Sequence, residues 1–247
     1  GGLQNGLIAL ALKANRPRAR IAIVERDSAL GGNHTWCFRV DDVDPKALDW
    51  IEPLICYRWP AYTVKFPGLE RTIDGGYSAI TSERFDDVVR GAIANDEGSC
   101  VLLESEVVRS DRTEVELGGG KVLNSRIVID ARGPAKDPDI RKKAGFQKFV
   151  GLEVRLSAPH GLRIPVLMDA TVDQRDGFRF FYTLPFGGDR MLIEDTYFHH
   201  SPELDVDGIR NEILRYADAK GYGIASIERE ETGVLPMPWT GFLPSRG

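Results

Sequence analysis

The first half of the chain alternates between helical and extended hydrophobic patterns. Apolar residues recur at helical spacing over residues 3–14, directly behind a glycine-rich start, which predicts an amphipathic helix. Residues 20–25 are a short apolar run closed by an acid and are predicted as a buried strand. A second helix is predicted to begin after Thr81 or Ser82, and its buried face consists of Phe85, Val88, Val89, Ala92 and Ile93.

Three further strands are predicted over residues 101–108, 113–117 and 126–130, with a glycine turn at 118–120. The last of them is a buried apolar run that leads into Gly133. A short apolar strand followed by a glycine turn is as typical of an ordinary strand end as of a place where the backbone meets a nucleotide.

From residue 149 onward the pattern changes to a period of two. Strands are predicted over residues 149–156, 165–171, 177–184 and 190–197, and a five-residue hairpin loop joins the last two. One helix, over residues 207–220, interrupts them and ends at Gly221. The predicted fold class is therefore α/β plus antiparallel β, in which a Rossmann-like nucleotide-binding domain is interleaved with a mostly antiparallel sheet domain.

Composition and charge exclude several classes of function. The 247 residues carry a net charge of −5, which is the wrong sign for nucleic-acid binding, and no apolar stretch is long enough to span a membrane or to act as a signal peptide. Three cysteines without C-x-x-C spacing predict neither a disulfide framework nor a zinc site, and they fit a reducing cytosol. His199 and His200 are adjacent, so they point to opposite faces of a strand, and no metal site is expected.

The start of the chain has nearly the spacing of a dinucleotide-binding fingerprint. Glycines at Gly1, Gly2 and Gly6 lead into a helix, and Glu25 closes the following strand 23 residues after Gly2. Such glycines let the backbone approach a pyrophosphate at the helix N-terminus, and the acid accepts hydrogen bonds from ribose hydroxyls. Asn5 departs from the pattern, because it stands where the third glycine is expected, and the strand that should precede the turn is missing. The alternative is a plain helix start with glycines in a turn.

Two consecutive acids lie within the apolar second strand of the predicted hairpin. Since side chains alternate along a strand, Glu194 and Asp195 point to opposite faces and do not form a pair on one face. A carboxyl among apolar side chains has a raised pKa and can act as an acid near neutral pH. The alternative is a structural carboxylate paired with Arg179 or Arg190.

Several segments of the chain, in order and over almost its whole length, resemble the bacterial lycopene β-cyclases of carotenoid biosynthesis. They are the glycine-rich start and five segments further along: Gly31-Gly32-Asn33-His34-Thr35-Trp36, Ile80-Thr81-Ser82-Glu83-Arg84-Phe85, Ile129-Asp130-Ala131-Arg132-Gly133, Leu167-Met168-Asp169-Ala170-Thr171-Val172-Asp173-Gln174 and Ile193-Glu194-Asp195-Thr196. The resemblance implies a non-redox flavoenzyme that needs reduced FAD, with NADPH or NADH as the reductant. Such an enzyme cyclises both ψ-ends of lycopene, through γ-carotene to β-carotene.

The resemblance also implies roles for individual residues. Glu194 matches the catalytic acid of the family, and Asp195 accompanies it. Aromatic faces near Glu194 are candidates for stabilising a carbocation, namely Phe180, Phe181 and Tyr182. The residues expected at FAD are Gly1, Gly2, Leu3, Gly6, Glu25, Gly32, His34 and Gly133.

The expected domains are interleaved along the chain. Residues 1–36 and 82–147 are expected to form the FAD-binding domain, without its first strand, and residues 37–81 and 148–247 the substrate domain, without its C-terminal part. The chain is therefore expected to be a fragment of a longer protein. Because lycopene dissolves in membranes, we expect a cytoplasmic protein associated peripherally with the inner membrane; the pattern does not decide its oligomeric state.

Two other functions fit much of the same pattern. One is a related flavoenzyme, either a monooxygenase or a geranylgeranyl-type reductase, which would consume NADPH or O2. The other is a non-catalytic module that binds a carotenoid or a nucleotide without converting lycopene.

Overall fold

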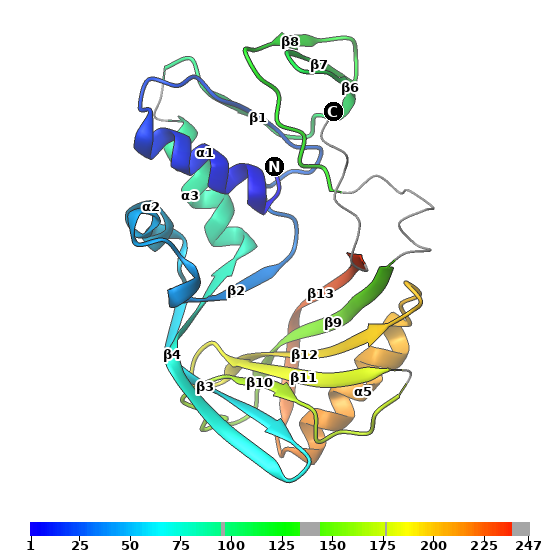
Figure 1. Ribbon diagram of the computed structural model, residues 1–247. Helices are drawn as coiled ribbons and strands as arrows, with labels where there is room; N and C mark the ends of the chain where they lie inside the picture. The colour runs from blue at the N-terminus through cyan, green and yellow to red at the C-terminus, as the bar shows by residue number, and fades with distance from the viewer. Residues whose placement is uncertain (95–96, 134–143, 176, 239–247) are drawn as a thin grey trace. The chain divides into compact units, whose positions relative to one another are not determined.

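The computed structural model describes residues 1–94, 97–133, 144–175 and 177–238, and the chain divides into two compact units (Figure 1). The first unit is Gly1–Arg58 with Ser78–Ala135, and the second is Trp59–Tyr77 with Lys136–Gly247. Each unit is thus built from two separate stretches of chain. Residues 134–143 and 239–247, which the expected domains include, lie outside the described residues.

Two helices and two parallel strands form the core of the first unit. Helices α1 (Leu3–Asn15) and α3 (Ser82–Ala94) confirm the helical predictions, and β1 (Ala22–Val24) pairs in parallel with β5 (Cys100–Leu102). Phe85 is fully buried where the two helices approach each other. The buried side chains of this core are Ala9, Leu10, Ile23, Leu30, Leu54, Ile80, Phe85, Val89 and Ile93.

The rest of the first unit is made of short elements. They are β2 (Thr35–Arg39), η1 (Val40–Asp42), η2 (Pro45–Ala47), α2 (Leu48–Ile51), η3 (Glu52–Leu54) and an antiparallel sheet of β6 (Val107–Ser110), β7 (Glu114–Leu117) and β8 (Val122–Asn124).

Two strand predictions in the first unit need correction. The strand predicted over residues 101–108 is split between β5 and β6, because Glu104 has a φ of 49° and interrupts the extended backbone. Residues 126–130 were expected as a buried strand, but no strand is assigned there among the described residues, and Ile127 and Ile129 are 72% and 43% exposed. An apolar run becomes a buried strand only when neighbouring strands pair with it.

A large sheet dominates the second unit. Its strand order is β13-β9-β12-β11-β10-β3-β4, and β4 continues into the first unit, where β2 is its next neighbour. The strands are β3 (Tyr57–Phe66), β4 (Leu69–Thr81), β9 (Ala144–Leu156), β10 (Val166–Asp169), β11 (Phe178–Pro185), β12 (Arg190–His199) and β13 (Ile224–Pro238). The pairs from β13 to β10 are antiparallel, whereas β10 and β3 are parallel. The strands predicted from residue 149 onward and the β11–β12 hairpin are confirmed; β3, β4 and β13 were not predicted.

Helix α5 (Val206–Ala219) covers one face of this sheet (Figure 1). Its buried residues Ile209, Ile213 and Tyr216 pack on odd-numbered residues of β11 and β12, among them Phe181 and Ile193. Because side chains alternate along a strand, the even-numbered residues of β11 and β12 lie on the opposite face. The two faces of one hairpin therefore have different surroundings.

Candidate active site

Strand β12 presents the two candidate acids to different environments. Asp195 is fully buried on the face that α5 covers, whereas Glu194 is half-buried on the opposite face. The separation of the two side chains predicted from the alternation is confirmed.

Asp195 is held by an arginine from the neighbouring strand. Arg179 Nε donates to Asp195 Oδ1 at 2.9 Å, Arg179 Nη2 donates to Oδ2 at 2.7 Å, and the Tyr197 hydroxyl donates to Oδ2 at 3.1 Å. Burial raises the pKa of Asp195, and the contacts with Arg179 and Tyr197 oppose that rise. Burial lowers the pKa of Arg179, but Asp195 outweighs this effect, so the guanidinium remains charged. The pairing of a carboxylate with Arg179 thus holds for Asp195.

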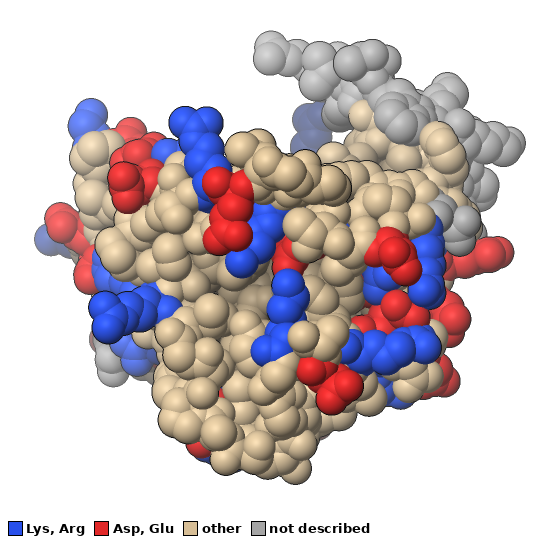
Figure 2. Space-filling model, turned by 90° about the horizontal axis from the view of Figure 1, so that it is seen from below, with Lys and Arg blue, Asp and Glu red and all other residues tan. Residues whose placement is uncertain are grey.

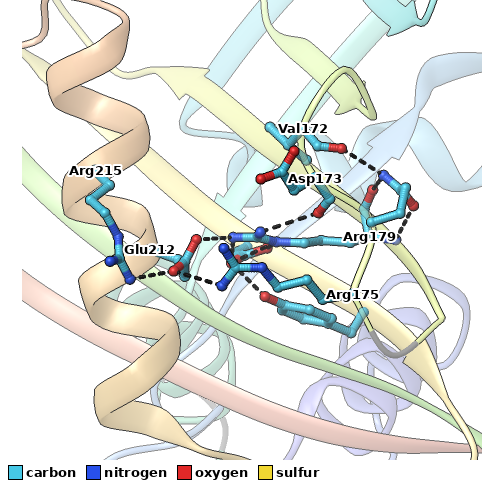
Figure 3. A network of polar contacts seen from close by, with 9 residues as sticks. Val172, Asp173, Arg175, Arg179, Glu212 and Arg215 are labelled. Atoms are coloured by element: carbon cyan, nitrogen blue, oxygen red, sulfur yellow. Dashed lines mark hydrogen bonds and ion pairs between the residues drawn. The ribbon is translucent and has the colours of Figure 1, made fainter.

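The same arginine joins the sheet to α5 (Figure 3). Arg179 Nη2 donates to Glu212 Oε2 at 3.1 Å, and Arg175 Nη1 donates to Glu212 Oε1 at 3.0 Å. Arg215, one turn further along α5, also contacts Glu212. This network fixes α5 on its face of the sheet.

Glu194 has different neighbours. The Thr196 hydroxyl donates to Glu194 Oε1 at 2.7 Å, and across the sheet Glu194 is paired with Tyr182 on β11 and Gly151 on β9. Burial raises the pKa of Glu194 to about 8; the Thr196 hydrogen bond opposes the rise, and the charges of Glu231 and Asp195 add to it. At neutral pH this carboxyl keeps its proton and can act as a general acid.

Aromatic rings line the sheet face next to Glu194. The Phe180 ring centroid lies 5.1 Å from that of Tyr182, 5.3 Å from that of Phe178 and 5.8 Å from that of Phe198. Phe181, also proposed from the sequence, lies on the other face, where its ring stacks on Tyr216 at 4.1 Å. Of the three candidate aromatic residues, Phe180 and Tyr182 therefore share the face of Glu194 and Phe181 does not.

In the first unit, the N-terminus of α1 has the chemistry of an anion site. Gly2 caps the helix without a side-chain hydrogen bond, and no acid lies in the first turn, which starts at Leu3. A Cβ on Gly2 would meet no atom of the described residues within 4 Å. The backbone N–H groups of this turn, together with the positive end of the helix dipole, suit a phosphate group.

Glu25 lies beside this turn, at the end of β1. Its Oε1 accepts the Asp27 N–H at 3.0 Å. Burial raises the pKa of Glu25, and the hydrogen bond from the Asp27 backbone opposes that rise. An ionised carboxylate next to the helix start suits hydrogen bonding to hydroxyl groups.

The other glycines predicted at the cofactor differ in their surroundings. A Cβ on Gly6 would lie 2.1 Å from the Phe85 ring, so this glycine permits the close packing of α1 and α3. Gly32 has a φ of 67°, and His34 follows it with its ring centroid 6.0 Å from that of Trp36. Gly133 has a φ of 89° and open space around it. The structure brings Gly1, Gly2 and Glu25 together at the helix start.

Three further observations concern partners. Figure 2 shows basic and acidic side chains interspersed over one face of the molecule, without a continuous basic surface there. No helix among the described residues is both long and apolar enough to cross a membrane. Within the same residues, His, Cys, Asp and Glu side chains form no group of three or more that could hold a metal.

The sequence model of the lycopene cyclase protein family matches residues 1–246. The chain belongs to the lycopene cyclase family. It is 42% identical over 241 residues to the lycopene beta-cyclase of Pseudescherichia vulneris, covering 98% of this chain and 61% of that protein. It is 36% identical to the enzyme of Paracoccus, covering 96% of this chain and 59% of that protein. This member of the family thus spans about three fifths of the length of its curated relatives.

The fold of this family member is that of FAD-dependent monooxygenases. A probable FAD-dependent monooxygenase from Pseudomonas aeruginosa superimposes with a TM-score of 0.58 at 19% identity, covering 96% of this chain and 71% of that one. The p-nitrophenol 4-monooxygenase of Pseudomonas putida gives a TM-score of 0.61 at 12% identity, covering 94% and 65%. The Rossmann-like α/β plus antiparallel fold class predicted from the sequence is confirmed.

Sequence reasoning missed Gly151 and Glu231, which complete the surroundings of Glu194 in this member of the family. Gly151 on β9 pairs with Glu194 on one side and with Glu231 of β13 on the other. A glycine within a predicted strand, which often marks a close approach of another group, is the signal that points to this place. The strand that carries Glu231 was not predicted, because the charged residues around it lack the apolar alternation of a buried strand.

Proposed function

We propose that the full-length protein is a lycopene β-cyclase and that Glu194 is its acid. The observation that carries the proposal is the position of Glu194, half-buried on an aromatic sheet face where burial raises its pKa to about 8, in a chain 42% identical to a lycopene beta-cyclase over nearly its whole length. The reaction turns linear lycopene through γ-carotene into β-carotene without net oxidation or reduction.

Glu194 begins each cyclisation by proton transfer. Its carboxyl proton adds to the terminal double bond of a ψ-end, which leaves a tertiary carbocation on the substrate and a carboxylate on Glu194. A neighbouring double bond of the polyene attacks the cation and closes the ring. The Glu194 carboxylate then removes a proton from the carbon next to the new cationic centre, which restores a double bond and regenerates the acid. Substrate and product are therefore isomers. Because the alkene is weakly basic, the acid must act in a place from which water is excluded.

The aromatic residues on the face of Glu194 stabilise the cation. The rings of Phe180 and Tyr182 have their centroids 5.1 Å apart in an edge-to-face arrangement, beside the strand that carries Glu194. A cation over an aromatic face gains about 0.5–2 kcal/mol, and more when water is excluded. Asp195, in its ion pair with Arg179, positions the strand and does not donate a proton.

The first unit offers the residues for FAD. Gly1, Gly2 and Leu3 at the start of α1 suit the diphosphate, and Glu25 suits ribose hydroxyls. Gly32, His34 and Gly133 are the further positions that we assign to cofactor binding, and Gly6 supports them through helix packing. When bound in its reduced anionic form, with NADPH or NADH as reductant, the flavin supplies negative charge that stabilises a nearby cation.

The substrate also determines where the protein works. Lycopene is a hydrocarbon that dissolves in the membrane, so we place the protein in the cytoplasm, associated peripherally with the surface of the inner membrane.

The test of the activity is expression of the full-length protein in a bacterial host that accumulates lycopene. Chromatography of the pigments should show β-carotene, with the mass of lycopene, in place of lycopene. With purified, dithionite-reduced enzyme under anaerobic conditions, cyclisation should proceed without stoichiometric reoxidation of flavin. Oxidation of one NADPH per ring, or uptake of O2, would instead identify a reductase or a monooxygenase. Binding of pigment or FAD with lycopene unchanged would identify a non-catalytic module.

Substitution of Gly2 tests the cofactor site separately. Because a Cβ at Gly2 meets no atom within 4 Å in the part of the chain that the structure describes, Gly2→Val should leave the melting temperature of the flavin-free protein nearly unchanged. Its branched side chain should nevertheless keep the diphosphate away from the helix start, so the flavin content of the purified protein should fall at least tenfold. Full flavin content in Gly2→Val contradicts this placement of the diphosphate.

A further inference from the structure

Three neighbouring strands bring two glutamates to either side of one glycine. On β12 Glu194 is paired with Gly151 of β9, and on β13 Glu231 is paired with the same Gly151. A Cβ on Gly151 would lie 3.1 Å from Glu231 Cγ and 3.3 Å from Glu231 Oε1. The Glu231 side chain therefore lies over Gly151, in the space that any other residue would fill and toward the strand of Glu194.

Glu231 is held there as a buried charge. It is 2% exposed, and Arg229 Nη1 donates to Glu231 Oε2 at 2.9 Å. Arg229 Nε in turn donates to Glu153 Oε2 at 3.1 Å, and Glu153 also contacts Arg190. The ion pair with Arg229 provides the partner that a buried carboxylate requires.

We propose that Glu231 is a positioning residue that acts through Glu194: held by Arg229 over Gly151, its carboxylate places a second negative charge beside Glu194 and so keeps the catalytic proton on Glu194. The inference rests on the proposed function of Glu194 as the acid. It gives Gly151 a role as well, because a side chain at this position would press on Glu231 and on Leu192, whose Cδ1 would lie 3.3 Å from the added Cβ.

The other groups around Glu194 do not supply the negative charge that we assign to Glu231. On β11 it is paired with Tyr182, and its own strand supplies the Thr196 hydroxyl and Asp195, whose charge is compensated by Arg179. On β9 Glu153 lies one pair further along, opposite Leu192, where two arginines compensate its charge. On β13 Arg229 is paired with Glu153 and not with Gly151, so it lies further along the strand than Glu231.

The causes of the raised pKa of Glu194 can be separated by substitution. Burial is the largest cause of its raised pKa, and the charges of Glu231 and Asp195 add to it. Removal of the Glu231 charge leaves the burial in place. The substitution should therefore shift the titration of Glu194 without returning it to the range of an exposed glutamate.

The experiment follows the protonation of Glu194 directly, by infrared difference spectroscopy of the full-length protein as a function of pH. The carboxyl band of Glu194 is assigned by its loss in Glu194→Gln. In Glu231→Gln the titration midpoint should fall by about one pH unit, a tenfold change in the ionisation constant. The high-pH limb of the pH profile for lycopene conversion should shift by the same amount. Glu231→Asp, which keeps the charge, should retain most of the wild-type midpoint.

Glu230→Gln is the matched control. Glu230 is the adjacent residue on β13 and also pairs with an arginine, Arg210, but Arg210 belongs to α5 on the other face of the sheet. Its substitution should leave the Glu194 midpoint unchanged. If Glu231→Gln is unstable, Glu231→Met removes the same charge and leaves Arg229 paired with Glu153.

Two outcomes overturn the inference. One is an unchanged Glu194 midpoint in the charge-removing variants, and the other is a wild-type Glu194 that already titrates in the ordinary glutamate range. The infrared titration needs no turnover, so it separates this result from a failure of the proposed function. A wild-type protein that leaves lycopene unchanged while the Glu194 midpoint still responds to Glu231 would contradict the cyclase proposal alone.

Discussion

Glu194 and Asp195 are consecutive in the sequence, yet they lie on two faces of one sheet and have different partners there. On the face covered by α5, Asp195 is fully buried and bound by Arg179. On the other face, Glu194 lies among aromatic rings, with Thr196 as hydrogen-bond donor and with Glu231 as a second carboxylate beyond Gly151.

The difference teaches how the same chemical group serves two purposes. A buried carboxylate with a bidentate arginine partner stays charged and fixes structure, and it is costly to disturb. A carboxyl with burial and a like charge nearby keeps its proton and can donate it. The partners, more than the depth of burial, separate the acid from the structural residue.

The largest expected effect is on turnover. Glu194→Gln keeps the size of the side chain but removes the transferable proton, so conversion of lycopene should fall by about 10²–10⁴-fold while the protein stays folded. Asp195→Asn should cost less turnover per folded molecule, because Asp195 acts only through the position of its strand. Pigment formed per flavin-loaded protein is the measurement. Near-normal turnover in Glu194→Gln would remove Glu194 from the mechanism.

The free energy of unfolding should depend most on the ion pair of Asp195 with Arg179. Arg179→Met leaves the fully buried Asp195 without its cation and should lower the free energy of unfolding by about 3–5 kcal/mol. Arg175→Met is the control, since the Arg175 side chain is 55% exposed and its bond to Glu212 should contribute less than about 1 kcal/mol. Urea denaturation of both variants provides the comparison. An equal loss of unfolding free energy in the two variants would show that the Asp195–Arg179 ion pair stabilises the fold no more than the exposed Arg175–Glu212 pair.

The next largest effect is the pH dependence of the free energy of unfolding, to which the titration of Glu194 contributes. The folded-state pKa of Glu194, about 8, lies above the ordinary value of 4.5, so its protonated form contributes stability that is complete below pH 4.5 and is lost as the pH rises through 8. Glu194→Gln removes this loss, so the variant should become progressively more stable than the wild type as the pH rises from 5 to 9. Melting curves from pH 5 to 9 test this. Parallel curves for the two proteins would show that Glu194 titrates normally.

The smallest effect concerns two adjacent phenylalanines. Phe180→Leu removes a ring from the face of Glu194 and should lower turnover by about 2–30-fold, the equivalent of about 0.5–2 kcal/mol of cation–π stabilisation. Phe181→Leu removes the ring that stacks on Tyr216 and should lower the melting temperature with little change in turnover per folded molecule. An exchange of these two outcomes would reverse our assignment of the faces.

Local pattern alone was enough for much of this molecule. Helical spacing predicted α1, α3 and α5, and a period of two predicted β9 to β12 with their hairpin. The same period placed Glu194 and Asp195 on opposite faces. These features depend on residues near one another in the chain, where backbone geometry dictates which side chains share a face.

Tertiary structure decided what each of these residues meets. The strand β13 escaped prediction because its buried residue Glu231 is a carboxylate in an ion pair with Arg229, whereas a buried strand position is expected to carry an apolar residue. Residues 126–130 look like a buried strand, but none is assigned there. Which acid pairs with Arg179, and that Glu231 lies over Gly151, follow from the register between strands far apart in sequence. That register is set by the packing of the whole sheet, so no local pattern contains it.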